Sequence, residues 1–185
     1  MANTRSLSSI TALASLTATV ENLLDANSTG TATISVGEQV THTFTTGTTA
    51  GKADRFWSSR ARALTAGNSE DIDVYDLGSL DIGAGAGKDP VGLAFANVDI
   101  TGILIENTSS SAGDLVIGNN ATTAAWVGFF GGDTQAITLK PTSIFFLSTE
   151  NDPGFAVADT SSHLLRIAAS GGDVTYDIHL MCRSA

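Results

Sequence analysis

The stretch VTYDIHLMCR, residues 174–183, decides the fold class of this 185-residue chain, because apolar and polar residues alternate along it. Successive side chains of an extended strand point to opposite faces, so every second residue shares a face. One face is therefore apolar, with Val174, Tyr176, Ile178, Leu180 and Cys182. The other face is mostly polar, with Thr175, Asp177, His179, Met181 and Arg183. This pattern predicts an antiparallel strand that buries one face only.

Other segments of the chain also predict strands. Residues 31–36 and 40–45 alternate in the same way, with Thr at most of their polar positions. Three apolar runs at 103–105, 115–117 and 144–147 predict strands buried on both faces, or with one face against a neighbouring subunit. Turn-forming residues such as Gly, Asn and Asp separate these segments. We therefore expect an all-β protein, a single-domain antiparallel β-sandwich of jelly-roll-like architecture.

The N-terminal region fits two patterns. Residues 9–24 carry apolar side chains at helical spacing, but part of the region also alternates as a strand does. Its Thr and Ser content favours a strand over 16–23. We expect residues 1–15 to form an extended N-terminal arm and residues 16–185 to form the sandwich domain.

The composition restricts the classes of partner. The net charge is −10, and only nine Lys and Arg residues occur in the chain. These cannot form the basic stripe that neutralises phosphates, so no nucleic-acid partner is expected. No apolar run is long enough for a membrane-spanning helix, and residues 1–18 lack the apolar core of a secretory leader. The single cysteine, Cys182, is expected to be a buried small apolar residue.

The chain offers few candidates for chemistry. Asp71 and Asp73 share a strand face and could bind Ca²⁺, but the other ligands of a calcium loop are missing, so a solvated face or a subunit salt bridge is favoured. The loop GAGAGK at 83–88 departs from the phosphate-binding pattern, because Ile82 stands at its first position and Asp89 follows Lys88. No two of the three His residues have metal-ligand spacing. We predict no catalytic residue, cofactor or metal, and hence no enzyme.

Two groups of residues are candidates for interaction. Residues 55–62 are locally basic and aromatic, and combinations of Arg with large aromatic residues are favoured at binding hot spots. The candidates are Arg55, Phe56, Trp57, Arg60 and Arg62, facing an acidic partner or a neighbouring subunit; a core strand with outward Arg residues is the alternative. In the N-terminal region, Leu7, Ile10 and Leu13 are apolar without obvious partners, and we expect them to reach a neighbour.

The large aromatic residues also allow a different function. Trp57 and Trp126, with Phe56, Phe129 and Phe130, could stack on sugars if they were exposed. Packing in a core or an interface is favoured, because each ring buries ~150–250 Å² of surface there. A carbohydrate-binding β-sandwich module is therefore kept as an alternative.

Several segments resemble a group of small tailed-bacteriophage virion proteins. They are residues 47–80 (GTTAGKADRFWSSRARALTAGNSEDIDVYDLGSL), 97–107 (NVDITGILIEN), 113–119 (GDLVIGN), 125–132 (AWVGFFGG) and 163–185 (HLLRIAASGGDVTYDIHLMCRSA). The resemblance implies a structural protein of the virion, most like a capsid decoration (cement) protein. It also implies a homotrimer that is made in the host cytoplasm and binds the major capsid protein or other virion proteins. A head fibre, neck or tail protein is the alternative within this group.

Overall fold

The computed structural model describes residues 10–23, 31–77, 96–110, 113–120 and 124–184, and within 18–23 and 31–36 it describes the backbone only. The protein is all-β, as predicted, and its strands pair antiparallel except for the short parallel pair of β2 with β3. The strands are β1 (Ile10–Leu23), β2 (Thr31–Thr46), β3 (Lys52–Ala53), β4 (Arg55–Leu64), β5 (Ser69–Asp73), β6 (Asn97–Asn107), β7 (Asp114–Gly118), β8 (Ala136–Leu139), β9 (Ile144–Ser148), β10 (Phe155–Ala156), β11 (Leu164–Ser170) and β12 (Val174–Ser184).

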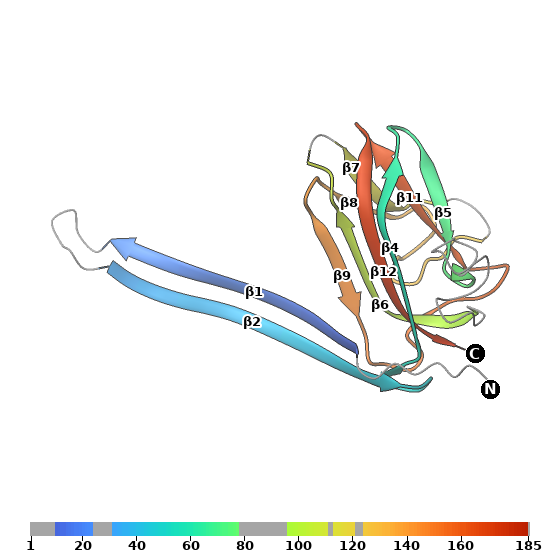
Figure 1. Ribbon diagram of the computed structural model, residues 1–185, viewed down its shortest axis with the longest axis horizontal. Coiled ribbons are helices and arrows are strands. Elements are labelled where there is room, and N and C mark those ends of the chain that lie inside the picture. The colour runs from blue at the N-terminus through green and yellow to red at the C-terminus, as the bar shows by residue number, and fades with distance from the viewer. Residues whose placement is uncertain (1–9, 24–30, 78–95, 111–112, 121–123, 185) are drawn as a thin grey trace.

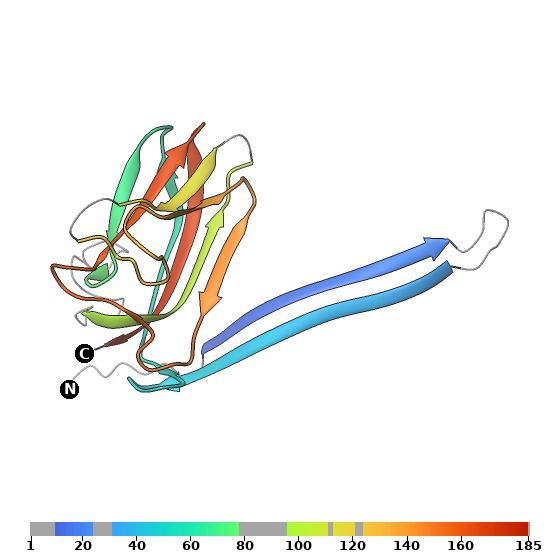
Figure 2. The same ribbon diagram turned by 180° about the vertical axis from the view of Figure 1, so that it is seen from behind.

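Two sheets lie face to face in a sandwich-like arrangement (Figure 1). One sheet has the order β4-β12-β6, with β9 and β10 both paired to the far side of β6. The other sheet has the order β5-β11-β7-β8. Seen from behind, β9 and β6 pass beside the base of the long β1–β2 hairpin (Figure 2).

The strands of the sandwich pair in a nested order along the chain. β4 pairs with β12, β5 with β11, β6 with β9, and β7 with β8, and each of these pairs is antiparallel. Two further antiparallel pairs, β12 with β6 and β11 with β7, join the nested pairs into the two sheets. The chain therefore runs out along four strands and returns along four others.

The two sheets share one apolar core. Trp57, Ile105 and Tyr176 point into it from the first sheet, and Ile117 and Leu165 from the second. Burying one aliphatic or Phe side chain contributes roughly 1.5–3 kcal/mol, so this cluster is the main source of stability for the sandwich. Cys182 is fully buried in the same cluster, as predicted.

β12 confirms the predicted alternation from Val174 to Leu180, whose apolar residues are buried and whose polar residues are half-buried. The prediction is wrong at Met181 and Arg183, which are buried although they belong to the mostly polar set. Met181 is covered because the base of the β1–β2 hairpin packs on it. Arg183 is buried because its guanidinium pairs with the carboxylate of Asp99, and the pairing of β12 with β6 shifts register nearby.

The apolar runs at 103–105 and 115–117 are buried on one face, and the run at 144–147 is at most half-buried. Ile103 and Ile105 are buried on β6, while Leu104 between them is half-buried; Ile144 on β9 is exposed. The prediction of burial on both faces is therefore wrong within this chain. The alternative, one face against a neighbouring subunit, stays a prediction.

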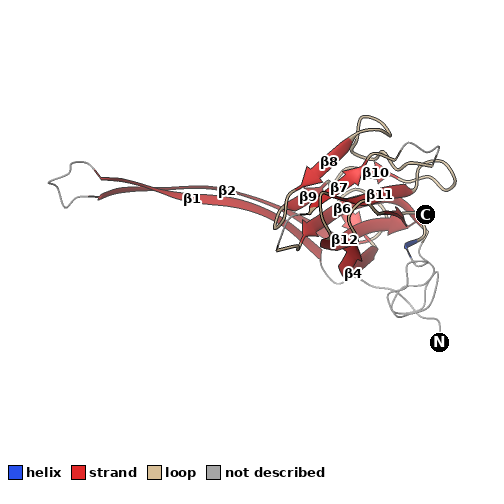
Figure 3. Cartoon of the chain, turned by 90° about the horizontal axis from the view of Figure 1, so that it is seen from above, coloured by secondary structure: helices blue, strands red, loops and turns tan. Residues whose placement is uncertain are grey.

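The β1–β2 hairpin leaves the sandwich and extends away from it (Figures 1 and 3). Its register is continuous from the pair Ile10 and Phe44 to the pair Leu23 and Thr31. The predicted strand over 16–23 is confirmed, but it begins earlier, at Ile10, and so crosses the predicted boundary between residues 15 and 16. Residues 1–9 of the predicted arm lie outside the described residues.

Candidate interaction site

Strand β4 divides the predicted basic and aromatic residues between its two faces. The side chain of Trp57 is fully buried in the core, so Trp57 is not available as a surface contact, and its prediction as an interaction residue is corrected. Phe56 points the other way and is 46% exposed. Arg60 is also open to solvent, with its side chain 75% exposed and its Nε atom 4.0 Å from Asp177.

Arg55 and Arg62 are engaged within the chain. The Nη1 of Arg55 donates a hydrogen bond to the carbonyl of Ala96 at 2.6 Å. Arg62 forms an ion pair with Glu70 and donates to the hydroxyl of Tyr176 at 3.2 Å. The alternative interpretation of this segment, a core strand with outward Arg residues, therefore fits Trp57 and Arg60, while Phe56 and Arg60 remain as surface candidates.

The Glu70 cluster has perturbed acidities. Burial alone would raise the pKa of Glu70, but hydrogen bonds from Arg62 and Tyr176 outweigh it and lower the pKa below the usual value. Burial, and then the hydrogen bond to Glu70, raise the pKa of Tyr176 well above its usual value. The carboxylate of Glu70, the guanidinium of Arg62 and the neutral phenol of Tyr176 therefore serve as hydrogen-bond partners for one another, and the cluster contributes to the stability of the fold.

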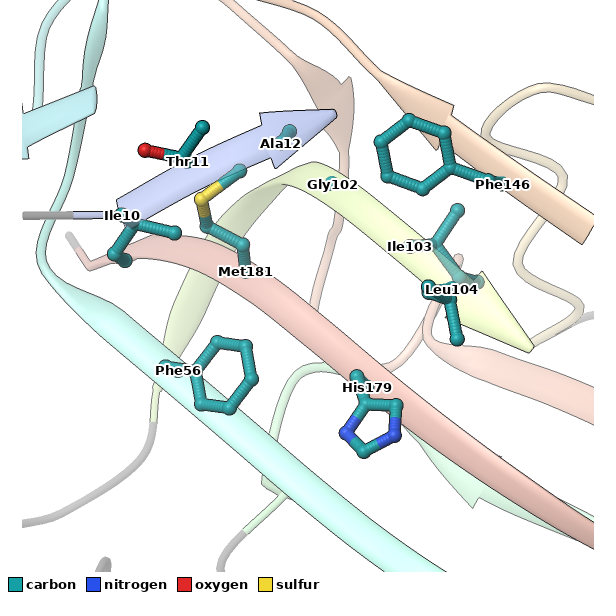
Figure 4. A pocket seen from close by; sticks show the side chains of 10 residues that line it. All are labelled: Ile10, Thr11, Ala12, Phe56, Gly102, Ile103, Leu104, Phe146, His179 and Met181. Atoms are coloured by element: carbon teal, nitrogen blue, oxygen red, sulfur yellow. The ribbon is translucent and has the colours of Figure 1, made fainter. Parts of the chain in front are cut away.

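An apolar groove of about 190 Å³ lies on the outer face of the β4-β12-β6 sheet, beside the base of the hairpin (Figure 4). We call it the outer groove. It is lined by Ile10, Thr11 and Ala12 of β1, Phe56 of β4, Gly102, Ile103 and Leu104 of β6, Phe146 of β9, and His179 and Met181 of β12. The lining residues come from β1, β4, β6, β9 and β12, and one of them, Ile103, also belongs to the core of the sandwich. The groove therefore depends on the pairing of four neighbouring strands and on the position of the hairpin.

His179 forms one wall of the outer groove. Its ring stacks on Phe56 with centroids 6.3 Å apart and planes inclined by 18°. Its Nδ1 atom lies 2.8 Å from the Oγ of Ser58, the residue opposite it on β4. Burial, followed by the positive charge of Arg60, lowers the pKa of His179 and so favours the neutral ring.

The base of the hairpin is fixed to the same outer face. Ala12 and Phe44 of the hairpin form a small buried cluster with Ala53 and Met181, against which Ile10 and Phe146 pack. The Nδ1 of His42 lies 2.8 Å from the Oγ of Ser148 on β9. The structure therefore brings the predicted residue Ile10 next to Phe56 across the outer groove.

Beyond this base, apolar residues of the hairpin are exposed. Directly opposite residues of an antiparallel pair share a face, so Ala14 and Val40 lie on the same face as Ile10 and Phe44, and Leu16 follows on it. Leu16 is 80% exposed and Val40 is 49% exposed. Leu13, a predicted interaction residue, is exposed on the opposite face. Leu7 lies outside the described residues.

Other sequence candidates have ordinary structural partners. Both guanidinium contacts of Arg166 to the Asp71 carboxylate are 2.9 Å, and the Oδ1 of Asp73 accepts the backbone N–H groups of Tyr75 and Asp76. Among the described residues, no group of three or more His, Cys, Asp or Glu side chains could hold a metal ion. The loop at 83–88 lies outside the described residues. No helix in the described part of the chain is long and apolar enough to cross a membrane.

The aromatic residues considered for sugar binding are mostly internal. Trp126 is buried, and its Nε1 donates to the carbonyl of Ala156 at 2.9 Å. Phe129 packs edge-on to Trp126, with centroids 5.4 Å apart, and contacts Phe130. Core packing, the favoured interpretation, therefore applies to both Trp residues.

Most residues of the outer groove are not predicted as interaction residues from the sequence. The predicted interaction residues include Ile10 and Phe56 but not Leu104, Phe146, His179 or Met181. One signal was present: Met181 is an apolar residue on the otherwise polar face of residues 174–183. The other residues come together only because their strands are neighbours in the sheet, and local sequence patterns do not show which strands are neighbours.

Comparisons with known proteins give no identification. No family model matches the chain, no curated protein matches it, and no solved structure matches it.

Proposed function

We propose that this protein is a non-enzymatic structural component of a tailed-bacteriophage virion, most like a capsid decoration protein that binds and stabilises the assembled head. Its partners would be copies of itself, as a homotrimer, and the major capsid protein or another virion protein. The resemblance of residues 47–80, 97–107 and 163–185 to small virion proteins supports this proposal.

The strand order supports a jelly roll as the finer description of the fold. A jelly roll places eight antiparallel strands in two sheets, and it is common in viral capsid domains. The nested pairs from β4 with β12 to β7 with β8, divided over two four-strand paths, match that description. Lectin domains use the same architecture, so the fold alone supports a structural role by analogy only.

The β1–β2 hairpin is the observation that carries the proposal. A two-stranded hairpin without further support is at best marginally stable in water. This one reaches away from the sandwich (Figure 3) and exposes Leu13, Leu16 and Val40. Exposed apolar residues on an extended element mark a surface that binds another protein. The hairpin would serve as the N-terminal arm that such a contact requires.

A decoration protein stabilises a head by binding the assembled lattice in preference to the free subunits. The acidic charge of −10 repels other acidic surfaces, so the contact with the lattice would be apolar or locally complementary. The exposed side chains of the hairpin could make an apolar contact. Arg60, the one strongly exposed cation of residues 55–62, could make a contact with an acidic group of the lattice.

Co-sedimentation tests the proposal. Heads are prepared from a mutant of the encoding phage that lacks this chain, mixed with the purified protein, and separated on a sucrose gradient. We expect saturable binding and heads that resist a higher temperature before they release DNA. Absence of binding at micromolar protein would contradict a decoration role, and binding on a glycan array instead would support the carbohydrate-binding alternative.

A further inference from the structure

Two unpartnered apolar surfaces lie on the same chain. The first is the distal hairpin face, which we define as Ala14, Leu16 and Val40; the exposed Glu38 lies opposite Leu16 on the same face. These residues lie on the face of the hairpin whose proximal part, Ala12 and Phe44, is buried against the sandwich. The face thus continues outward from a buried contact into solvent, where its side chains have no partner in the described part of the chain.

The second surface is the outer groove. Its exposed wall is formed by Phe56, which stacks on His179, and Leu104 and Phe146 complete its apolar floor (Figure 4). Small-molecule sites usually enclose about 300–1,000 Å³. The outer groove, at about 190 Å³, is smaller than that range. It suits one or two aliphatic side chains of a protein better than it suits a small ligand.

The hairpin of the same molecule does not fill the outer groove with its distal face. Leu16 is six residues beyond Ile10, and a strand rises about 3.4 Å per residue, so the two lie about 20 Å apart. Because Ile10 lines the groove and the hairpin leads away from it, Leu16 lies far from the groove of its own chain (Figure 1).

The proximal part of the same hairpin face already packs on an apolar surface of the sandwich. Ala12 and Phe44 pack on Met181, and Met181 also lines the outer groove. The groove is therefore continuous with a contact that this hairpin face already makes. A second hairpin laid beside the first would meet the same kind of apolar surface.

Charge also favours contact between these two surfaces. Two copies of a chain with charge −10 repel each other unless they meet where charge is low. Residues 10–23 and 31–46 contain no Lys or Arg, and Glu21 and Glu38 are their only acidic residues; Glu38 is the only one of the two on the distal hairpin face, opposite Leu16. The residues that line the outer groove include no Asp, Glu, Lys or Arg.

We propose that the distal hairpin face of one molecule occupies the outer groove of a second copy. Each copy supplies a hairpin and a groove, so the contact is head-to-tail, and it closes into a ring when the rotation between copies permits. The inference rests on the proposed structural role, because it specifies the self-contact of that assembly. Leu16 and Val40 enter between Phe56 and Leu104, and Phe56 is the main contact on the receiving side.

Disulfide trapping tests this contact in the full-length protein. Leu16→Cys and Phe56→Cys are made in separate chains, one of which carries a tag, and are mixed under mild oxidation. A disulfide needs Cα atoms about 4.4–6.8 Å apart, so it forms only at a close contact. We expect the mixed tagged–untagged dimer as the main product. Unmodified protein controls for Cys182, which is buried.

The matched control is Thr17→Cys, whose side chain is exposed on the opposite face of the hairpin one residue beyond Leu16. Mixed with Phe56→Cys, it should give at least five-fold less cross-linked dimer. Equal yields from Thr17→Cys and Leu16→Cys would overturn the inference. So would a Leu16–Leu16 dimer as the main product, which would mean that two hairpin faces pair with each other.

A charge substitution gives a second readout. Leu16→Glu places a second carboxylate, next to that of Glu38, against the apolar groove of the neighbour and should shift the protein to monomers in light scattering, whereas Thr17→Glu should not. An unchanged mass for Leu16→Glu would overturn the inference. Binding to heads is measured separately. If the disulfide forms but the protein does not bind heads, only the proposed function is contradicted. If the protein binds heads but the disulfide does not form, only the contact between hairpin and groove is contradicted.

Discussion

Arg183 and Asp99 form a buried ion pair, which the alternation of the sequence does not predict. The Nε of Arg183 donates to the Oδ1 of Asp99 at 2.8 Å, and both side chains are almost fully buried. Alternation along residues 174–183 put Arg183 on an outward face. The pattern could not show that strand β6 supplies a carboxylate next to it, because that depends on pairing between residues 84 positions apart.

Arg183→Met should be strongly destabilising, because it leaves the Asp99 carboxylate buried without its cation. We expect the free energy of unfolding to fall by about 3–5 kcal/mol in urea denaturation. Lys140→Met is the matched control, since it breaks the exposed pair with Asp114 and should cost about 1 kcal/mol or less. Similar losses for both variants would contradict the role assigned to the buried pair.

Glu70 makes stability depend on pH, in a direction set by its lowered pKa. A carboxylate whose pKa is lower in the folded state stabilises the protein above the unfolded pKa, and this contribution is lost as the pH falls through the folded value. The usual value for Glu is 4.5, so the loss begins near that pH and continues below it.

Glu70→Gln should therefore flatten the decline in stability between about pH 5 and pH 3. The measurement is the urea midpoint at several pH values for wild type, Glu70→Gln and the control Glu38→Gln. Glu38 is exposed on the hairpin, and its variant should retain the wild-type decline. If the two variants decline equally, hydrogen bonds to Glu70 are not the cause.

The hairpin is the element that sequence patterns predicted in part. Alternation over 40–45 and the choice of a strand over 16–23 were correct, and β2 and β1 contain those residues. The strand begins six residues earlier than predicted, at Ile10. That start is set by tertiary contact: Ala12 and Ile10 pack on Met181 and Phe146, which lie on strands far away in the sequence.

Phe44→Ala tests how the hairpin is held. Phe44 is almost fully buried where the hairpin meets the sandwich, and a buried Phe→Ala change typically costs about 3–5 kcal/mol. We expect amide hydrogen exchange in residues 38–44 to accelerate at least ten-fold, while core strands β6 and β12 keep their protection. Thr43→Ala, at an exposed neighbouring position, should leave exchange unchanged. Uniform acceleration throughout the chain would contradict a locally docked hairpin.

At the scale of the whole molecule, the all-β class could be predicted and the site could not. Strand-sized apolar patterns, separated by turn residues, contain enough information for the class. The outer groove needs β4, β6, β9 and β12 to be neighbours, and their pairings join residues up to about 130 positions apart in the sequence. Local periodicity does not determine such pairings, so the sequence predicts Phe56 and Ile10 as interaction residues but does not predict that they line the same groove.

The assembly should respond to salt in a way that separates apolar from ionic contact. We expect light scattering to give about 57 kDa, three times the 18.9 kDa of one chain. Raising the salt from 0.05 to about 0.5 M should favour the trimer, because salt screens the repulsion between acidic copies and leaves apolar contact intact. Dissociation at high salt would instead indicate ion pairs between subunits.

Electron microscopy of particles from the encoding phage, with this protein labelled by a specific antibody fragment, shows whether the protein lies on the head. We expect label distributed over the surface of the head. Label restricted to the neck, tail or fibres would contradict the decoration role within the virion. Particles without label would contradict the claim that this protein is part of the virion.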